Sequence, residues 1–168
     1  MGRVVIPKEI RRTMRIREGD PLEIYTDAQG EVIFKKYSPI GEMTDSAAEF
    51  AEVLAKDCLF GIAICDRDRV IAAAGVSKRE TVDRKLTPEL EALMENRRAY
   101  IYKSGESEFV LPFDDIDAKA SVIVPIIASG DIIGAVILLM NEKNRVASET
   151  DVRLCKVAAG FLGRQMEE

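Results

Sequence analysis

The sequence predicts an α+β protein in two parts: a small β-rich head, then a larger α/β sandwich with a central antiparallel sheet and flanking helices. Residues 22–36 hold two alternating apolar and polar segments around a turn, which indicates a β-hairpin. Residues 120–140 are apolar except near 129–131, which is typical of two buried strands joined by a turn. Residues 44–56 and 148–166 repeat apolar side chains at helical spacing.

The chain begins with a segment in which basic and apolar side chains are sorted. Branched residues at 3–6 favour a short β-strand, and Pro7 has a φ angle suited to the start of a helix that we expect to reach about residue 14. The basic residues of this helix are spaced i, i+3, i+4 and i+7 and so share one face: Lys8, Arg11, Arg12 and Arg15. The opposite face is apolar and suited to packing.

The charge of this first segment has one sign. Six basic residues accompany a single acid, Glu9: Arg3, Lys8, Arg11, Arg12, Arg15 and Arg17. A solvated amphipathic helix, the ordinary interpretation of a charge run, usually mixes signs. The segment therefore favours a surface that meets nucleic-acid phosphates.

The basic charge is local. The chain has a net charge of −5, yet residues 1–36 carry eight Lys or Arg against six Asp or Glu, a net +2, and the remainder carries −7. A basic head on an acidic body fits a regulator whose head is attracted to DNA while its body is repelled.

The head is predicted as a strand, a short helix and the hairpin, with Gly19 and Pro21 ending the helical segment. A unit of about 36 residues is too small for a stable core without disulfides, a metal or a partner. The sequence offers neither of the first two, so a partner chain is implied.

The second part follows residues 38–43, which contain Pro39 and Gly41 and are predicted as a linker. Its elements are expected in this order: a helix at 44–56, strands at 60–65 and 69–74, a helix from Pro88 to about 96 capped by Thr87, short strands at 100–102 and 109–111, strands at 121–128 and 132–140, and a last helix opened by a capping box of Ser148 and Asp151. Because the two long strands are apolar throughout, helices are expected on both faces of the sheet.

The residues of common catalytic and metal sites are missing. The sequence has no His, and it contains neither the phosphate-binding loop G-x-x-x-x-G-K-[ST] nor the dinucleotide-binding motif G-x-G-x-x-G. Cys58, Cys65 and Cys155 lack a C-x-x-C spacing and are expected as buried thiols in a reducing cytoplasm. We therefore predict no enzyme activity, no cofactor and no metal, with the acidic pairs at 66/68 and 114/115 in solvated turns. The longest apolar region is interrupted, so no membrane span is expected.

Two stretches resemble known families. The stretch GRVVIPKEIRRTMRIREGDPLEIYTD, followed by GEVIFKKYSP, resembles the swapped-hairpin DNA-binding domain of the AbrB/MazE type. The stretch PIIASGDIIGAVILLM, with the order of elements around it, resembles a GAF domain. Their combination is similar to the stage V sporulation protein T-like regulators and covers essentially the whole chain.

The resemblance implies a DNA-binding transcription regulator of sporulation genes. Its parts would be a swapped-hairpin head at 1–37, a linker at 38–43 and a GAF-like domain at 44–168 with flanking oligomerisation helices. Family members carry a further strand before the motif, so we expect this head to be truncated at its N-terminus. Two chains of the family interleave their hairpins into a dimer, and two dimers join through the helices flanking the GAF domain into a tetramer.

The resemblance also implies which residues touch DNA. The residues carried over are Arg3, Arg11 and Arg12, with Lys8 beside them on the same face. Arg15 and Arg17 are weaker candidates.

Two alternatives stay open. GAF domains generally sense small molecules, and an unknown small-molecule ligand and a purely oligomerising role are equally supported here. The chain could instead be an antitoxin-like or other protein-interaction module without its own DNA regulation. The tail of an antitoxin is polar and disordered, however, whereas residues 44–166 have the periodicity of a folded domain.

Overall fold

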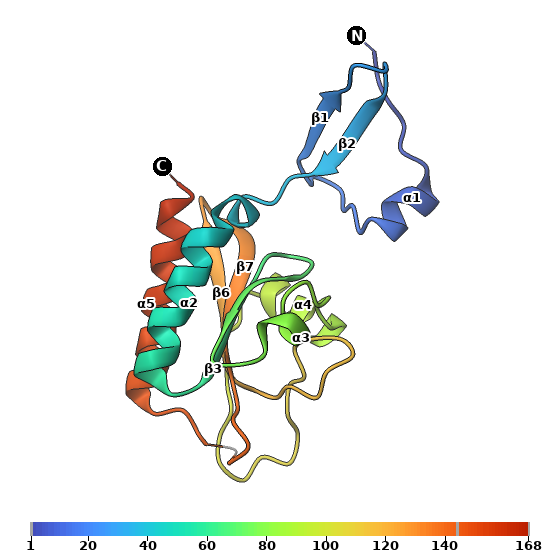
Figure 1. Ribbon diagram of the computed structural model, residues 1–168. Coiled ribbons are helices and arrows are strands. Elements are labelled where there is room, and N and C mark those ends of the chain that lie inside the picture. Colours follow the sequence, from blue (N-terminus) through green and yellow to red (C-terminus); the bar gives the residue numbers. More distant parts are fainter. Residues whose placement is uncertain (1, 144, 168) are drawn as a thin grey trace. The chain divides into compact units, whose positions relative to one another are not determined.

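The structure is a computed structural model that describes residues 2–143 and 145–167. The chain divides into two compact units between Ser38 and Pro39. We name them the head unit (residues 2–38) and the sheet unit (residues 39–143 and 145–167), and describe each by itself (Figure 1).

The head unit contains α1 (Lys8–Thr13) and a hairpin of β1 (Leu22–Thr26) and β2 (Val32–Lys36). The two strands are antiparallel, as predicted, with Leu22 opposite Lys36. Residues 3–6 are not a strand, so that prediction was wrong. Branched side chains favour extended chain, but a strand also needs a neighbouring backbone with which to form a ladder.

The turn of the hairpin follows from its own residues. The Asp27 carboxylate accepts hydrogen bonds from the backbone N–H groups of Gln29 and Glu31 at 2.9 and 2.8 Å. Gly30 adopts a φ of +87°, which glycine tolerates without a steric cost. These contacts fix the register of the hairpin.

The sheet unit is built on a five-stranded antiparallel sheet in the order β4-β3-β7-β6-β5. Its strands are β3 (Gly61–Cys65), β4 (Val70–Ala74), β5 (Tyr100–Ile101), β6 (Ala120–Ala128) and β7 (Asp131–Leu139). Its helices are η1 (Ile40–Met43), α2 (Thr44–Cys58), α3 (Lys78–Thr81), α4 (Pro88–Glu95) and α5 (Glu149–Gln165). The predicted central hairpin is the pair β6 and β7.

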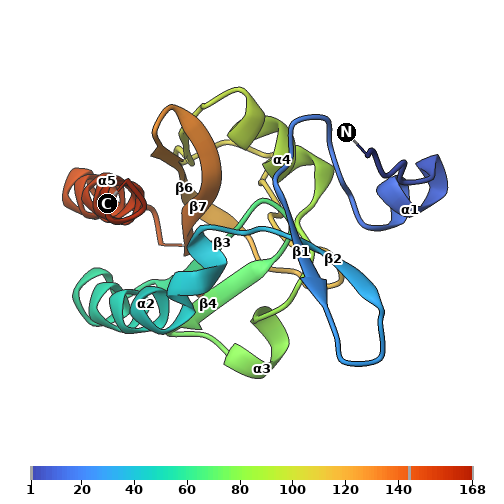
Figure 2. The same ribbon diagram turned by 90° about the horizontal axis from the view of Figure 1, so that it is seen from above.

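Alternating side chains of the strands form two cores, one on each face of the sheet. Ile62 and Ile64 of β3 belong to the core beneath α2 and α5, while Ala63 and Cys65 belong to the other. Figure 2 shows α2 and α5 on one side of the sheet and α4 on the other. The second face is completed by the irregular segment 110–118 rather than by a second long helix.

Two segments of the sheet unit differ from their predicted structure. No strand forms at 109–111, because the backbone there makes a single bond to β6, from Ala120 N–H to the Val110 carbonyl at 2.9 Å. Within the predicted linker, residues 40–43 form η1, and Ile40 is fully buried in the core beneath α2 and α5.

Helix caps form where the sequence predicted them. The Thr87 side chain accepts the Leu90 N–H at the start of α4. Ser148 and Asp151 form a reciprocal capping box on α5, with Ser148 N–H donating to the Asp151 carboxylate at 2.8 Å and Asp151 N–H to Ser148 Oγ at 3.2 Å. Both helices are therefore fixed at their first residue.

Helix α5 approaches β6 closely at Gly163. A Cβ at that position would overlap the Ile127 carbonyl oxygen of β6. Gly160, one turn earlier on the same helix, has open space around it. The absence of a side chain at 163 thus permits the contact between α5 and the sheet.

Candidate nucleic-acid interface

Three of the four residues predicted to bind DNA lie on α1. Lys8, Arg11 and Arg12 are all exposed, and their spacing puts them on one helical face. The helix follows Pro7, whose carbonyl accepts the Arg11 N–H at 3.0 Å. Arg3, the fourth residue, precedes the helix and is also exposed. The segment 3–12 therefore presents four cationic side chains to solvent.

The end of α1 differs from the prediction. Arg15 was expected on the same helical face, but the helix ends at Thr13 and Arg15 adopts a left-handed φ of 52°. Its N–H donates to the Arg12 carbonyl at 3.2 Å, and the Ile16 N–H donates to the Arg11 carbonyl at 2.8 Å. These are the paired bonds of a Schellman cap, whose left-handed position favours glycine. An arginine there costs roughly 1–2 kcal/mol.

The turn after α1 is tied to the hairpin by two charged side chains. Lys36 Nζ donates to the Arg15 carbonyl oxygen at 2.8 Å and lies 3.6 Å from Asp20 Oδ2. The same carboxylate oxygen accepts the Arg17 backbone N–H at 2.9 Å. The Lys36 and Asp20 side chains are only 18% and 3% exposed. We name this pair the Asp20/Lys36 clamp.

The clamp could not be predicted from the sequence. Lys36 was predicted only as a residue of the hairpin, because it is separated from its acceptor Arg15 by 21 positions. The only local signal was Asp20 in a turn, a position that solvated aspartates also occupy.

The apolar side chains of the head unit remain exposed. None of residues 2–38 is buried. Large apolar side chains that are 41–86% exposed are Val4, Val5, Ile10, Met14, Ile24, Tyr25, Val32 and Ile33. Ordinary monomeric proteins rarely leave so much of a small unit's apolar surface in water.

A second exposed apolar surface lies along α2 and α5. The rings of Phe50 and Phe161 stack with centroids 5.3 Å apart and 11° between their planes, and Phe161 is still 48% exposed. Val53 shares the helical face of Phe50, and Val157 shares that of Phe161. These two valines are 57% and 66% exposed. We name these four residues the α2/α5 surface.

The remaining candidate groups lie inside the sheet unit. Cys58, Cys65 and Cys155 are free and buried. Burial raises the pKa of the Cys65 and Cys155 thiols, and the Asp66 carboxylate adds to the effect on Cys65. Asp66, predicted in a solvated turn, is instead buried, and its Oδ1 accepts the backbone N–H groups of residues 68 and 69 at 2.7 and 2.8 Å.

Residues 2–143 and 145–167 contain neither a candidate metal cluster nor a helix that could span a membrane. No group of three or more His, Cys, Asp or Glu side chains in that part of the chain is placed to hold a metal ion. No helix in it combines the length and apolar character needed to cross a bilayer.

Two protein families match the chain in succession. Residues 42–167 match the family described as stage V sporulation protein T C-terminal, transcription factor. Residues 1–41 match the family described as antidote-toxin recognition MazE, bacterial antitoxin.

Similar proteins agree with these matches. The chain is 45% identical over 168 residues to stage V sporulation protein T of Bacillus subtilis (strain 168), an alignment that covers 100% of this chain and 93% of that protein. It is 47% identical over 57 residues to the transition state regulatory protein AbrB of the same organism, covering 30% of this chain and 58% of that protein.

Among solved structures, one similar fold is the cofactor-binding GAF domain of the nutrient sensor CodY from Clostridium difficile, with a TM-score of 0.51. The match covers 74% of this chain and 92% of the CodY domain, and the two sequences are 13% identical. This likeness shows the fold alone and confirms the GAF-like sheet unit.

The family match covers more than half of the chain, and the Bacillus subtilis relative aligns along all of it. The chain therefore belongs to the stage V sporulation protein T family of transcription regulators.

Proposed function

We propose that this chain regulates sporulation genes by binding DNA through the exposed basic residues of the head unit. The contacts that we assign are Arg3, Lys8, Arg11 and Arg12. The observation that carries the assignment is their common exposure on one short segment whose other side is apolar. Phosphate contacts fix the register of a protein on DNA, and arginine can in addition read guanine edges.

The form that binds DNA is a dimer of interleaved head units. The proposal is supported by the head unit itself, in which none of residues 2–38 is buried. A second chain would cover the exposed apolar side chains of the hairpin and α1. Pairing also brings two basic helices to one DNA face, which raises affinity through effective concentration.

Two such dimers join into a tetramer through the α2/α5 surface. Phe161, Val53 and Val157 supply apolar side chains that are about half exposed or more in one chain. A face of this kind on two neighbouring helices suits helix packing against a second copy.

The sheet unit has a second proposed role as the receiver of a signal. A GAF domain of the CodY type binds a cofactor in that protein, and an unidentified small molecule in this sheet unit would couple a metabolic signal to the geometry of the heads. We place the regulator in the cytoplasm and assign it no catalytic step.

DNA binding by the whole chain tests the proposal. A mixed-sequence duplex with a fluorescent label is titrated with protein at several salt concentrations, and the anisotropy gives the affinity at each. Eight phosphate contacts, four from each chain of a dimer, predict a slope of log affinity against log salt near −7. Absence of binding at low salt would refute the proposed function.

A further inference from the structure

We propose that Asp20 and Lys36 are positioning residues, which fix the basic helix α1 for DNA without touching DNA themselves. The inference rests on the proposed DNA-binding function and adds a role for the clamp behind the interface. Three features of the head unit support this role: the left-handed turn at Arg15, the contacts of the clamp, and the shortness of α1.

The turn at Arg15 needs an external restraint. A residue other than glycine persists in the left-handed region only where the surrounding structure determines its conformation. Here Lys36 Nζ bonds the carbonyl oxygen of Arg15 itself at 2.8 Å. Because the direction of that carbonyl depends on the Arg15 torsions, the bond holds the unfavourable conformation directly.

Asp20 holds the ammonium group in place. Its carboxylate lies 3.6 Å from Lys36 Nζ and also accepts the Arg17 N–H, so it fixes both ends of the turn. Hydrogen bonds to charged groups are stronger than those between neutral groups, and the Asp20 side chain is 3% exposed. The clamp is therefore a sheltered ion pair rather than a solvated one.

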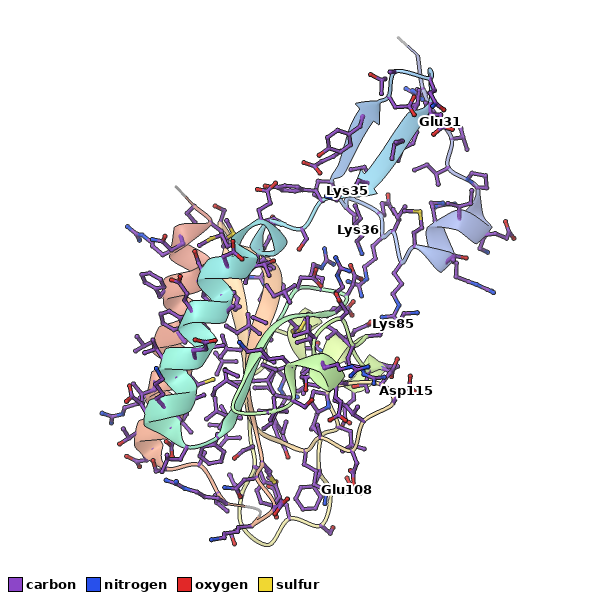
Figure 3. All side chains as sticks on the ribbon, in the orientation of Figure 1. Glu31, Lys35, Lys36, Lys85, Glu108 and Asp115 are labelled. Carbon is purple, nitrogen blue, oxygen red and sulfur yellow. The ribbon has the colours of Figure 1, made fainter. Side chains whose placement is uncertain are left out.

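Lys36 differs in this respect from its neighbour Lys35. Successive strand residues point to opposite faces, and Lys35 is exposed with Glu23 opposite it on β1. Figure 3 labels both lysines at the end of β2. Lys35 thus provides a control with the same charge and strand but outside the clamp.

The helix that carries the DNA contacts cannot hold its own geometry. It has six residues and no side-chain cap at its N-terminus, and isolated helices shorter than about 12 residues are marginal in water. Within one chain, its Schellman turn is thus a restraint on the helix turn that carries Arg11 and Arg12. Without the clamp, α1 would become ordered only on binding, which weakens affinity while leaving the number of phosphate contacts unchanged.

The first test compares Lys36→Met with Lys35→Met in the full chain, with the same labelled duplex and salt series. We expect Lys36→Met to bind about tenfold more weakly than Lys35→Met at every salt concentration, with equal salt slopes. Equal affinities would overturn the proposal. So would a slope for Lys36→Met that is smaller in magnitude by about 1.8, because Lys36 of each chain in the dimer would then itself be a phosphate contact.

The second test removes the need for the restraint. In the Arg15→Gly background the left-handed turn costs little, so Lys36→Met should weaken binding less than about twofold. The same tenfold loss in both backgrounds would show that the clamp does not act through the turn. If Lys36→Met dissociates the dimer, adding Arg15→Gly should restore it, and continued dissociation would overturn the proposal.

A measurement without DNA separates this inference from the proposed function. Hydrogen exchange at the Arg15 and Ile16 amides should be faster in Lys36→Met than in Lys35→Met, since both amides form the Schellman bonds. Equal exchange rates would overturn the clamp even in a chain that binds DNA. Failure of the unmodified chain to bind DNA would instead contradict only the proposed function.

Discussion

Replacing Arg11 and Arg12 together with alanine measures how much of the DNA affinity comes from α1. Both side chains are exposed on that helix, so the substitutions remove charge without opening a core. In a dimer the change removes four of the eight assigned phosphate contacts, and the slope of log affinity against log salt should fall from about −7 to about −3.6. Over a fourfold rise in salt, binding should weaken about 20,000-fold for the unmodified chain but only about 150-fold for the variant.

Fluorescence anisotropy of a labelled mixed-sequence duplex provides the slopes. The matched control is Arg98→Ala plus Lys103→Ala, which removes two exposed cations from the sheet unit. The control changes the net charge by the same amount, and its slope should stay near that of the unmodified chain. An Arg11→Ala plus Arg12→Ala slope equal to the control slope would refute the assignment of these arginines to phosphates.

Three other experiments probe the sheet unit. Gly163→Ala forces a Cβ against the Ile127 carbonyl oxygen and should lower the free energy of unfolding by about 1–3 kcal/mol. Gly160→Ala, at a helix position with open space, should raise the free energy of unfolding by up to about 1 kcal/mol. Equal effects of the two substitutions in urea unfolding would contradict the packing of α5. Phe161→Glu should convert a tetramer into a dimer in size-exclusion chromatography with light scattering, and a persistent tetramer would exclude the α2/α5 surface as the contact. Burial raises the pKa of the Cys65 and Cys155 thiols above the ordinary 9.0, so both stay protonated when folded while the unfolded chain ionises. The free energy of unfolding should therefore fall by about 1.4 kcal/mol per pH unit for each thiol as the pH rises above 9, until the folded thiols ionise too; a chain with both replaced by Ala that keeps the full dependence would contradict this assignment.

Elements with a local signal were predicted correctly from the sequence. The capping box of Ser148 and Asp151 depends on residues three positions apart, and the hairpin at 22–36 depends on alternation and a turn. The failures occurred where a structure needs a distant partner. Residues 3–6 have the composition of a strand but form none, and residues 109–111 make only one backbone bond to β6.

The candidate site shows the same division. The identity and spacing of Lys8, Arg11 and Arg12 are visible in the sequence, since a single short helix relates them. The departure of Arg15 from that helix is not visible, because its left-handed turn contains no glycine that would signal it. The Lys36 contact with that turn depends on the fold of the whole head unit.

A head unit whose large apolar side chains are exposed in a single chain makes DNA occupancy depend on how much protein a cell synthesises. If folding and pairing of the heads are one event, then below the dimer dissociation constant the concentration of paired heads rises with the square of chain concentration. Halving synthesis would remove about three quarters of the DNA-competent heads. Target genes would then respond to a threshold in regulator dosage, and a gradual rise in synthesis would give a sharper developmental decision.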